Sequence, residues 1–467
     1  MKPFKIFYIL LTTNLMVLSC ALIFPSEGLQ IKDFTLRFLN LNEWAYEKPE
    51  VNVDIAEILP DFNLNDLASD TSLLAMEEPG ETKDFEAIEF NRRAAKEFAV
   101  FFEKLAEAKN ENEPLRILHY GDSQIEGDRI TSVLREQLQA EYGGSGPGMV
   151  PVNEPNHSRS SIKIDTRGNW VRKQVFGPRG SQLAGNSYGV LGFSHSFSNA
   201  VMDTQQTDTA KAQIFLSPMY TAFKRASDYT RLKVLYRNYG FGQLAIDGVE
   251  MAMDTSGKPV IYARNVSNTG KHQIDFANDF SAQVYAVIAD DSNGVAVDNI
   301  AVRGSSGLVF TKMDAQNLAD QYRLMNVGMI IYQYGVNVVP YIRDDYSFYQ
   351  KQVSQQLLAL KKLNPGVPIL VIGASDMSRK EDGNYESYPN IPLIVEAQRQ
   401  AAKETGCAFW NLYGAMGGNN SMPAWVNAKP ALAQADYIHF TQRGANVVGQ
   451  KLHQALKMFQ YDLELVQ

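Results

Sequence analysis

The sequence contains very little cysteine. Only two cysteines occur in 467 residues: Cys20 lies in an apolar N-terminal run, and Cys407 lies in the apolar segment Gly-Cys-Ala-Phe-Trp. The chain beyond the apolar run therefore has no second cysteine for an internal disulfide, and its stability has to come from a hydrophobic core. The apolar neighbours of Cys407 indicate a buried core thiol rather than a nucleophile.

Basic charge and metal-ligand clusters are scarce as well. The formal net charge is −8 and the sequence has no basic patch, which argues against a general nucleic-acid binder. No group of His, Cys and Asp residues has the spacing of a metal site, so we expect no metal and no organic cofactor. The glycine-rich loop at 143–148 lacks the Lys-Ser/Thr of a phosphate-binding loop, and we interpret it as a flexible exit from a helix.

A long apolar run is present near the N-terminus. It extends from Ile6 to Phe24 after two lysines, close to the length of about 20 residues that spans a bilayer. Positive charge before the run predicts a cytoplasmic N-terminus and an exported remainder in the periplasm or cell envelope. We expect residues 1–24 to be an uncleaved membrane anchor. A cleaved signal peptide and a lipoprotein at Cys20 are the alternatives.

Two segments of different character follow this run. Residues 25–84 carry scattered apolar residues and an acidic bias without a clear period, so we expect a juxtamembrane tether. Residues 85–108 have the spacing of an amphipathic helix, with Asp84 as its N-cap. Its apolar stripe consists of Phe98, Phe101, Phe102 and Leu105.

The segment from Leu115 to Gly127 combines a strand with a Gly-Asp-Ser turn. Residues 116–120 form a short run of β-forming residues, which predicts a buried strand, and helical spacing begins at Ile130. A turn between them places Ser123 at the C-terminal edge of a sheet and near a helix N-terminus, where N–H groups favour an oxyanion. This is a typical position for a nucleophilic serine, although an ordinary capped turn has the same composition.

A possible partner for this serine lies near the other end of the chain. Asp436 precedes His439 by three residues, so the carboxylate can accept a hydrogen bond from one imidazole nitrogen. The other nitrogen is then free to take a proton from a serine hydroxyl. The remaining five histidines have no such pattern. A hydrogen-bonded histidine at a helix start is the alternative for His439.

Between these two ends, from about residue 151 to 298, the texture of the sequence changes. Short runs of β-forming residues recur between turn signals such as Asp247-Gly248, which predicts an all-β sandwich. Most of its aromatic residues are expected in the sandwich core, but some could stack on sugar rings. The candidates are Trp170, Tyr236, Tyr239, Phe241 and Tyr285.

The Gly-Asp-Ser and Asp-x-x-His segments resemble the first and last blocks of the SGNH (GDSL-type) hydrolase family. The resemblance implies a catalytic triad of Ser123, His439 and Asp436. The second block of the family matches at Gly304, although Ala301 stands where many members have another glycine. It implies that the N–H groups of Ser123 and Gly304 form part of an oxyanion hole.

The third block of the family matches at Gly335 and Asn337, while Val338 replaces an aspartate. A side-chain amide at the end of a central strand can donate to an oxyanion, so Asn337 is the third candidate donor. Strands and helices alternate on either side of the predicted sandwich, in 85–150 and 299–467. We therefore expect a three-layer α/β/α parallel sheet, with the sandwich inserted into it and the active site at the C-terminal strand edge.

Three more residues lie in the region of this edge. Asp376 follows a predicted strand, and a supporting role in a loop is expected for it rather than a role in the chemistry. Met422 and Trp425 belong to a long loop at 414–430 that precedes the Asp-x-x-His segment. Such loops are often functional, so these two side chains are candidates for lining an acyl or sugar pocket.

The resemblance also implies a reaction. Exported peptidoglycan O-acetylesterases of this family are similar in architecture, with a β-sandwich between the serine and glycine blocks. We therefore expect a serine esterase that removes O-acetyl groups from a cell-envelope glycan such as peptidoglycan, with the acetylated glycan and the membrane as its partners. An acetylesterase acting on another polysaccharide such as xylan, an O-acetyltransferase using the same serine, and a catalytically inactive glycan-binding protein are the alternatives.

Overall fold

The computed structural model describes residues 29–31, 34–36, 86–153, 159–198, 209–219, 223–267, 270–279 and 282–466. The expected membrane anchor at 1–24 lies outside these residues, as does most of the expected tether. The chain divides into two compact units, Met1–Glu50 and Val51–Gln467. The described part of the first is an antiparallel pair of short strands, β1 (Leu29–Ile31) and β2 (Phe34–Leu36). Among the described residues, no helix is both long enough and apolar enough to span a bilayer.

A five-stranded parallel sheet organises the second unit, in the order β15-β3-β16-β17-β20. Side chains along β3 and β17 are buried on both faces, as expected for a parallel sheet that is covered on both sides. The predicted α/β fold with a parallel sheet is confirmed. The strands are β3 (Leu115–Gly121), β15 (Val295–Ala301), β16 (Val327–Gln333), β17 (Ile369–Ile372) and β20 (Ala408–Trp410).

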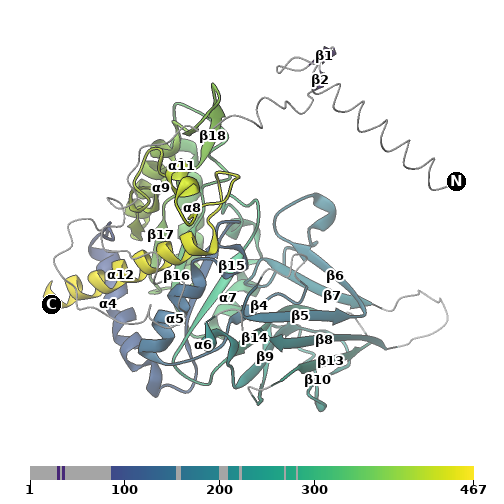
Figure 1. Ribbon diagram of the computed structural model, residues 1–467. Helices are drawn as coiled ribbons and strands as arrows, with labels where there is room; N and C mark the ends of the chain where they lie inside the picture. Colours follow the sequence, from purple (N-terminus) through teal and green to yellow (C-terminus); the bar gives the residue numbers. More distant parts are fainter. Residues whose placement is uncertain are drawn as a thin grey trace. The chain divides into compact units, whose positions relative to one another are not determined.

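Helices cover the two faces of this sheet (Figure 1). Ile117 of β3 belongs to one hydrophobic core with α4, α5 and α12, and the next residue, Leu118, belongs to a second core with α7, α8 and α9. Successive side chains of β3 therefore point into two different cores on opposite faces of the sheet, so the sheet is the middle one of three layers. The helices are α4 (Arg92–Glu107), α5 (Thr131–Tyr142), α6 (Lys224–Ser227), α7 (Ala315–Arg323), α8 (Ser347–Leu363), α9 (Ile391–Thr405), α10 (Leu412–Ala415), α11 (Ser421–Asn427) and α12 (Gln442–Val466).

Helix α4 begins later than predicted. Glu89 forms an antiparallel bridge with Phe409 of β20, and the described residues 86–91 are not helical. Asn91 then caps the helix, because its side chain accepts hydrogen bonds from the N–H groups of Arg93 and Ala94. The N-cap predicted at Asp84 is therefore wrong.

Two antiparallel sheets occupy the chain between β3 and β15. Their orders are β11-β10-β13-β8-β5 and β12-β9-β14-β7-β6, with β4 paired to β14. Both contribute to one hydrophobic core, so they pack face to face. The strands are β4 (Gly148–Val150), β5 (Ile162–Arg167), β6 (Asn169–Gln174), β7 (Phe193–Ser198), β8 (Ala210–Pro218), β9 (Arg231–Arg237), β10 (Gly242–Ile246), β11 (Val249–Ala252), β12 (Val260–Asn265), β13 (His272–Asn278) and β14 (Gln283–Asp290).

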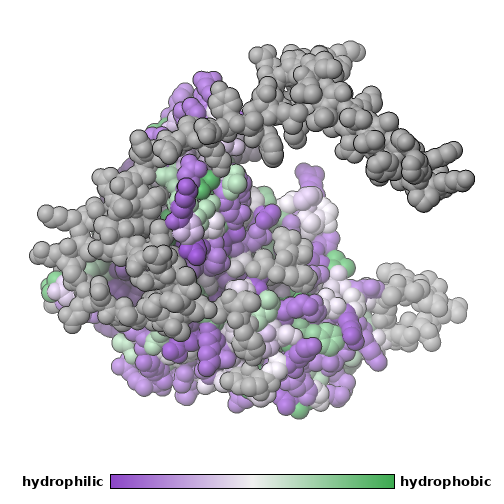
Figure 2. Space-filling view, in the orientation of Figure 1, coloured by the Kyte–Doolittle hydropathy of each residue, from purple (hydrophilic) through white to green (hydrophobic). Residues whose placement is uncertain are grey.

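The aromatic candidates for sugar contact in these sheets separate into two groups. Tyr236 and Tyr285 are fully buried, and the Trp170 ring packs edge-on against Phe197 at 5.1 Å between centroids. Tyr239 and Phe241, on the turn between β9 and β10, are 62% and 81% exposed. On the visible face of the described part, hydrophilic residues predominate and hydrophobic ones form small patches (Figure 2).

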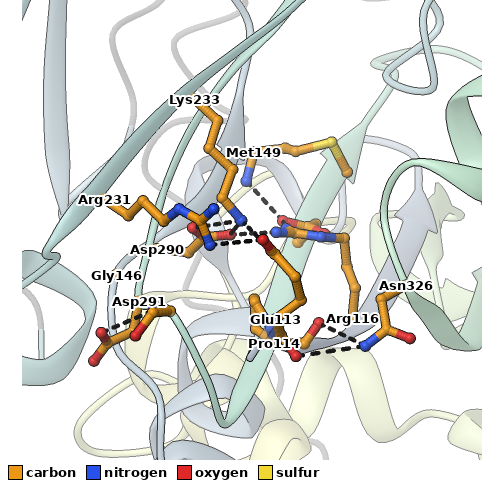
Figure 3. A network of polar contacts seen from close by, with 12 residues as sticks. Glu113, Pro114, Arg116, Gly146, Met149, Arg231, Lys233, Asp290, Asp291 and Asn326 are labelled. Carbon is orange, nitrogen blue, oxygen red and sulfur yellow. Dashed lines mark hydrogen bonds and ion pairs between the residues drawn. The ribbon is translucent and has the colours of Figure 1, made fainter. Parts of the chain in front are cut away.

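A buried ion network joins the antiparallel sheets to the parallel sheet (Figure 3). Arg116 of β3 pairs with Asp298 of β15 at 2.7 Å and also with Asp290 of β14. Lys233 of β9 lies 3.2 Å from Asp290 and 2.9 Å from Glu113. All four strands therefore meet at one cluster of opposite charges. The parallel sheet already resumes at the start of β15, before residue 299, because β15 pairs with β3 from its first residue.

Candidate active site

Ser123 lies just beyond the C-terminal end of β3. Its side chain is 7% exposed, and the neighbouring Asp122 accepts a hydrogen bond from the N–H of Gln124 at 3.0 Å. The chain then forms a short 3₁₀ turn, η4 (Glu126–Asp128), and α5 starts only at Thr131. The expected helix N-terminus is therefore not directly beside Ser123, because this turn intervenes.

The structure brings the predicted triad residues together. Nε2 of His439 lies 2.8 Å from Oγ of Ser123, and Nδ1 of His439 lies 2.7 Å from Oδ2 of Asp436. With the Nδ1 proton donated to the carboxylate, Nε2 is left to accept the serine proton. This geometry has the order and the distances that a serine nucleophile with a general base requires.

Asp436 is fixed by more than the imidazole. Its Oδ1 accepts the backbone N–H groups of Ile438 and His439, both at 3.0 Å. Burial raises the pKa of this carboxyl, but the hydrogen bonds from the His439 ring and the two N–H groups outweigh it, and the pKa of Asp436 is lower than the ordinary value. Asp436 is thus held as a carboxylate that can stabilise an imidazolium.

Gly304 lies in a turn attached to the end of β3. Val302 donates its N–H to the carbonyl of Gly121 at 2.8 Å, and the N–H of Ser305 closes the turn onto the carbonyl of Val302 at 3.1 Å. Gly304 has φ +78°, which favours glycine. Within the described part of the chain, no backbone carbonyl accepts the N–H of Ser123 or of Gly304, and the role of these two groups as oxyanion donors stays a prediction.

Asn337 also lies close to the nucleophile, but its amide is engaged. Its Nδ2 donates to the carbonyl of Ser305 at 3.0 Å and to Oδ2 of Asp122 at 3.3 Å. To donate to an oxyanion, the amide has to give up one of these bonds, and the longer bond to Asp122 is the weaker of the two. The role of Asn337 in the oxyanion hole remains a prediction.

Asp122 itself has an unusual environment. Burial raises the pKa of its carboxyl to about 7, and hydrogen bonds from Gln124, Asn337 and Gly335 offset this only in part. It is the second residue of the Gly-Asp-Ser block and is only 1% exposed. A group that titrates near neutral pH therefore lies directly behind the proposed nucleophile.

Asp376 does not contact the triad. It lies after β17, and its carboxylate accepts hydrogen bonds from Oγ of Ser387 at 2.6 Å, Oγ of Ser421 at 3.2 Å and the N–H of Met422 at 2.7 Å. Burial raises the pKa of Asp376 to about 6. Its contacts join the segment after β17 to the end of a short strand at Ser387 and to the start of a helix at Ser421, in agreement with the supporting role expected for it.

Two predicted pocket residues are placed elsewhere. Met422 and Trp425 have no exposed surface, and the Trp425 ring packs on Phe440 at 5.5 Å between centroids. Their segment is the helix α11, whose apolar side faces the core. The prediction that they line an acyl or sugar pocket is wrong, because both side chains are buried in the core. The short helix has glycine and asparagine on its flanks, and in the sequence this composition resembles a loop.

Two polar residues near the nucleophile were missed in the sequence. Arg129 donates to the carbonyl groups of Ser123 and Gln124, and burial lowers the pKa of its guanidinium. Gln124 is 2% exposed and bonds to the segment that carries His439. Most of their partners are backbone groups, which leave no trace in a residue pattern, and only the position next to Ser123 singles out Gln124.

The cysteine and metal expectations concern residues away from this site. Cys407 is 2% exposed, and burial raises the pKa of its thiol to about 11, so its assignment as a core thiol is confirmed. Across the described ranges, no group of three or more His, Cys, Asp or Glu residues is arranged to hold a metal ion.

Comparisons with known proteins identify the fold. No family model matches the sequence, and no curated protein matches it. A solved structure described as "Peptidoglycan O-acetylesterase in action, 5 min" is 18% identical, with a TM-score of 0.64 over 80% of this chain and 99% of that chain.

Two more distant structures are an acetyl xylan esterase and a family two carbohydrate esterase from Cellvibrio japonicus. The first is 17% identical, with a TM-score of 0.27 over 34% of this chain and 81% of that chain. The second is 10% identical, with a TM-score of 0.23 over 66% of this chain and 96% of that chain. These scores are too low to carry an argument, whereas the O-acetylesterase match shows that this chain shares the fold of that protein, in agreement with the α/β fold that the sequence resemblance implies.

Proposed function

We propose that this protein is an exported serine esterase that removes O-acetyl groups from a cell-envelope glycan such as peptidoglycan. The observation that carries the proposal is the continuous hydrogen-bonded series from Ser123 through His439 to Asp436, with separations of 2.8 and 2.7 Å. It lies at the C-terminal edge of a parallel sheet, where ligands bind in such folds. The shared fold with a peptidoglycan O-acetylesterase supports the choice of substrate class.

The reaction follows from the positions of these atoms. Nε2 of His439 takes the hydroxyl proton as Oγ of Ser123 attacks the ester carbonyl, and Asp436 stabilises the resulting imidazolium. The N–H groups of Ser123 and Gly304 stabilise the oxyanion, and Asn337 is the proposed third donor. His439 then gives the proton to the sugar oxygen as its bond to the acetyl carbon breaks, so that the sugar leaves as a free hydroxyl, and water hydrolyses the acetyl-serine by the same steps.

The proposal also includes the location and the larger substrate. The anchor expected at 1–24 would hold the catalytic domain outside the cytoplasm, attached to the membrane. The antiparallel sheets would form an inserted β-sandwich that contacts the glycan strand. Of the aromatic candidates on these sheets, Tyr239 and Phe241 are exposed and available for stacking on sugar rings, whereas Tyr236 and Tyr285 are not.

A chromogenic acetate ester tests the activity directly. The wild-type protein should release acetate, and Ser123→Ala should abolish the release while keeping the same thermal unfolding. A wild-type protein without activity would instead support the inactive glycan-binding alternative. Acetate release from O-acetylated peptidoglycan compared with acetylated xylan identifies the glycan, and acetyl transfer to a chito-oligosaccharide acceptor would reveal an O-acetyltransferase.

A further inference from the structure

The side chain of Gln124 links the two segments that carry the proposed nucleophile and base. Its Nε2 donates to the carbonyl of Ile438 at 2.7 Å and to Oγ of Ser375 at 2.8 Å, and its Oε1 accepts the N–H of Phe440 at 3.4 Å. Both amide protons and the carbonyl oxygen are thus engaged. At 2% exposure the side chain is shielded from water, so bonds lost here are not replaced by solvent.

Two of these three partners flank the histidine. Ile438 precedes His439 and Phe440 follows it, so the side-chain amide of Gln124 is hydrogen-bonded to the backbone on both sides of His439. Gln124 is also joined by a peptide bond to Ser123. The same residue therefore constrains both ends of the 2.8 Å bond between Oγ of Ser123 and Nε2 of His439.

Other contacts hold the histidine segment from a different direction. The hairpin of β18 (Ser378–Glu381) and β19 (Asn384–Ser387) donates the N–H of Ser378 to the carbonyl of Tyr437 at 3.0 Å. The Tyr385 ring stacks on Tyr437 at 3.5 Å between centroids. These contacts fix the segment to the hairpin, but they do not involve Ser123, so they cannot set its distance from the imidazole.

We infer that Gln124 is a positioning residue that sets the separation of Ser123 and His439 for proton transfer. The inference rests on the proposed esterase function. Without the bonds from Gln124 to Ile438 and Phe440, the histidine segment keeps its bonds to the hairpin and to Gln434 but loses its direct link to the residue beside Ser123, and the imidazole moves relative to the serine hydroxyl. A misplacement of about 1 Å at reacting groups costs on the order of 100-fold in rate.

The test uses Gln124→Met, which keeps the length of the side chain and removes its hydrogen bonds. The matched control is Gln139→Met, because Gln139 is also fully buried and its Nε2 donates to the carbonyls of Gly146 and Val295. Val295 starts β15, at the opposite edge of the sheet from the triad. Both variants lose two donated bonds, but only one of them loses them beside the triad.

With the chromogenic acetate ester, Gln124→Met should lower kcat by on the order of 100-fold with a nearly unchanged KM, because ground-state binding is retained. Gln139→Met should keep kcat near the wild-type value while losing similar thermal stability. A purely structural role for Gln124 would lower stability equally in both variants and leave kcat of the folded protein unchanged, which would overturn the inference.

Amide hydrogen exchange of the peptide spanning 434–441 gives a readout that needs no turnover. Exchange there should be faster in Gln124→Met and unchanged in Gln139→Met. Unchanged exchange in Gln124→Met would overturn the inference even if kcat fell. If the wild-type protein released no acetate, the proposed function would fail, and faster exchange would still support the link between the two segments.

Discussion

Replacing Asp436 by asparagine separates the orientation of the histidine from the stability of its segment. Asparagine retains an oxygen that can accept the N–H groups of Ile438 and His439, which Oδ1 of Asp436 now accepts at 3.0 Å. The amide nitrogen then faces Nδ1 of His439, 2.7 Å away, and donates to it. The imidazole has to place its proton on Nε2 instead, where it cannot accept the proton of Ser123.

The expected loss follows from this change of tautomer. In a fully buried triad, the aspartate-to-asparagine change lowers kcat by about 10⁴-fold. The side chain of Asp436 is 42% exposed, so solvent can partly support the imidazolium, and we expect a loss of about 10³-fold. The melting temperature should stay close to that of the wild type, because both backbone bonds persist. The assay is kcat on the chromogenic acetate ester with a parallel thermal melt.

A second aspartate provides the control. Asp314 caps α7 with the same local pattern, since its Oδ1 accepts the N–H groups of Gln316 and Asn317 at 3.0 and 3.1 Å. Asp314→Asn should leave kcat unchanged. If Asp436→Asn kept kcat within a factor of about ten of the wild type, the argument from the tautomer would be refuted, because a serine and histidine would suffice without the carboxylate.

Three other perturbations test separate parts of the structure. Burial raises the pKa of Asp122 to about 7 from an unfolded value near 4, so the folded state binds one more proton between these pH values. The free energy of unfolding should therefore fall by up to about 4 kcal/mol as pH rises through this range. Thermal melts from pH 4 to 8 should show a weaker pH dependence for Asp122→Asn than for the wild type. Arg116→Met leaves two buried aspartates without their main partner and should lower the free energy of unfolding by about 3–5 kcal/mol in a denaturant titration. Glu113→Gln changes a half-exposed side chain and should lower it by less than about 1 kcal/mol. Equal losses in the two variants would contradict the role of Arg116 as the central partner of the network. Gly304→Ala strains a residue at φ +78° and shifts its N–H, so kcat should fall by about 10²–10³-fold. The control Gly248→Ala, at φ +75° with open space around it, should be equally strained but fully active. A lower kcat in both variants would indicate misfolding rather than loss of the oxyanion donor.

The sequence predicts the parallel sheet and the triad because each depends on local signals. The buried strand before Ser123 and the Asp-x-x-His spacing are both contained in a few consecutive residues. The Arg116 network is different, since it joins residues more than 170 positions apart in the chain. Such pairs depend on the packing of one sheet against another, and no local spacing encodes them.

The boundaries of the helices show the same limit. Asp84 has the composition of an N-cap, but the bridge of Glu89 to the sheet decides that α4 starts after Asn91. The segment around Trp425 has glycine and asparagine on its flanks, and the core contact of its apolar side makes it a helix. In both cases tertiary contacts override what the neighbouring residues favour.

The shared ion network decides how the protein can be divided. A fragment cut out at 151 and 298 would retain Lys233, Asp290 and Asp298 but lose Arg116 and Glu113, so the two buried aspartates would lose the arginine that they share. It would also lack β4, leaving an edge of β14 uncovered. Transfer of the antiparallel sheets to another protein therefore has to include β3 and β4. The parallel and antiparallel sheets are better regarded as one cooperatively folding unit than as a catalytic domain with a separable module.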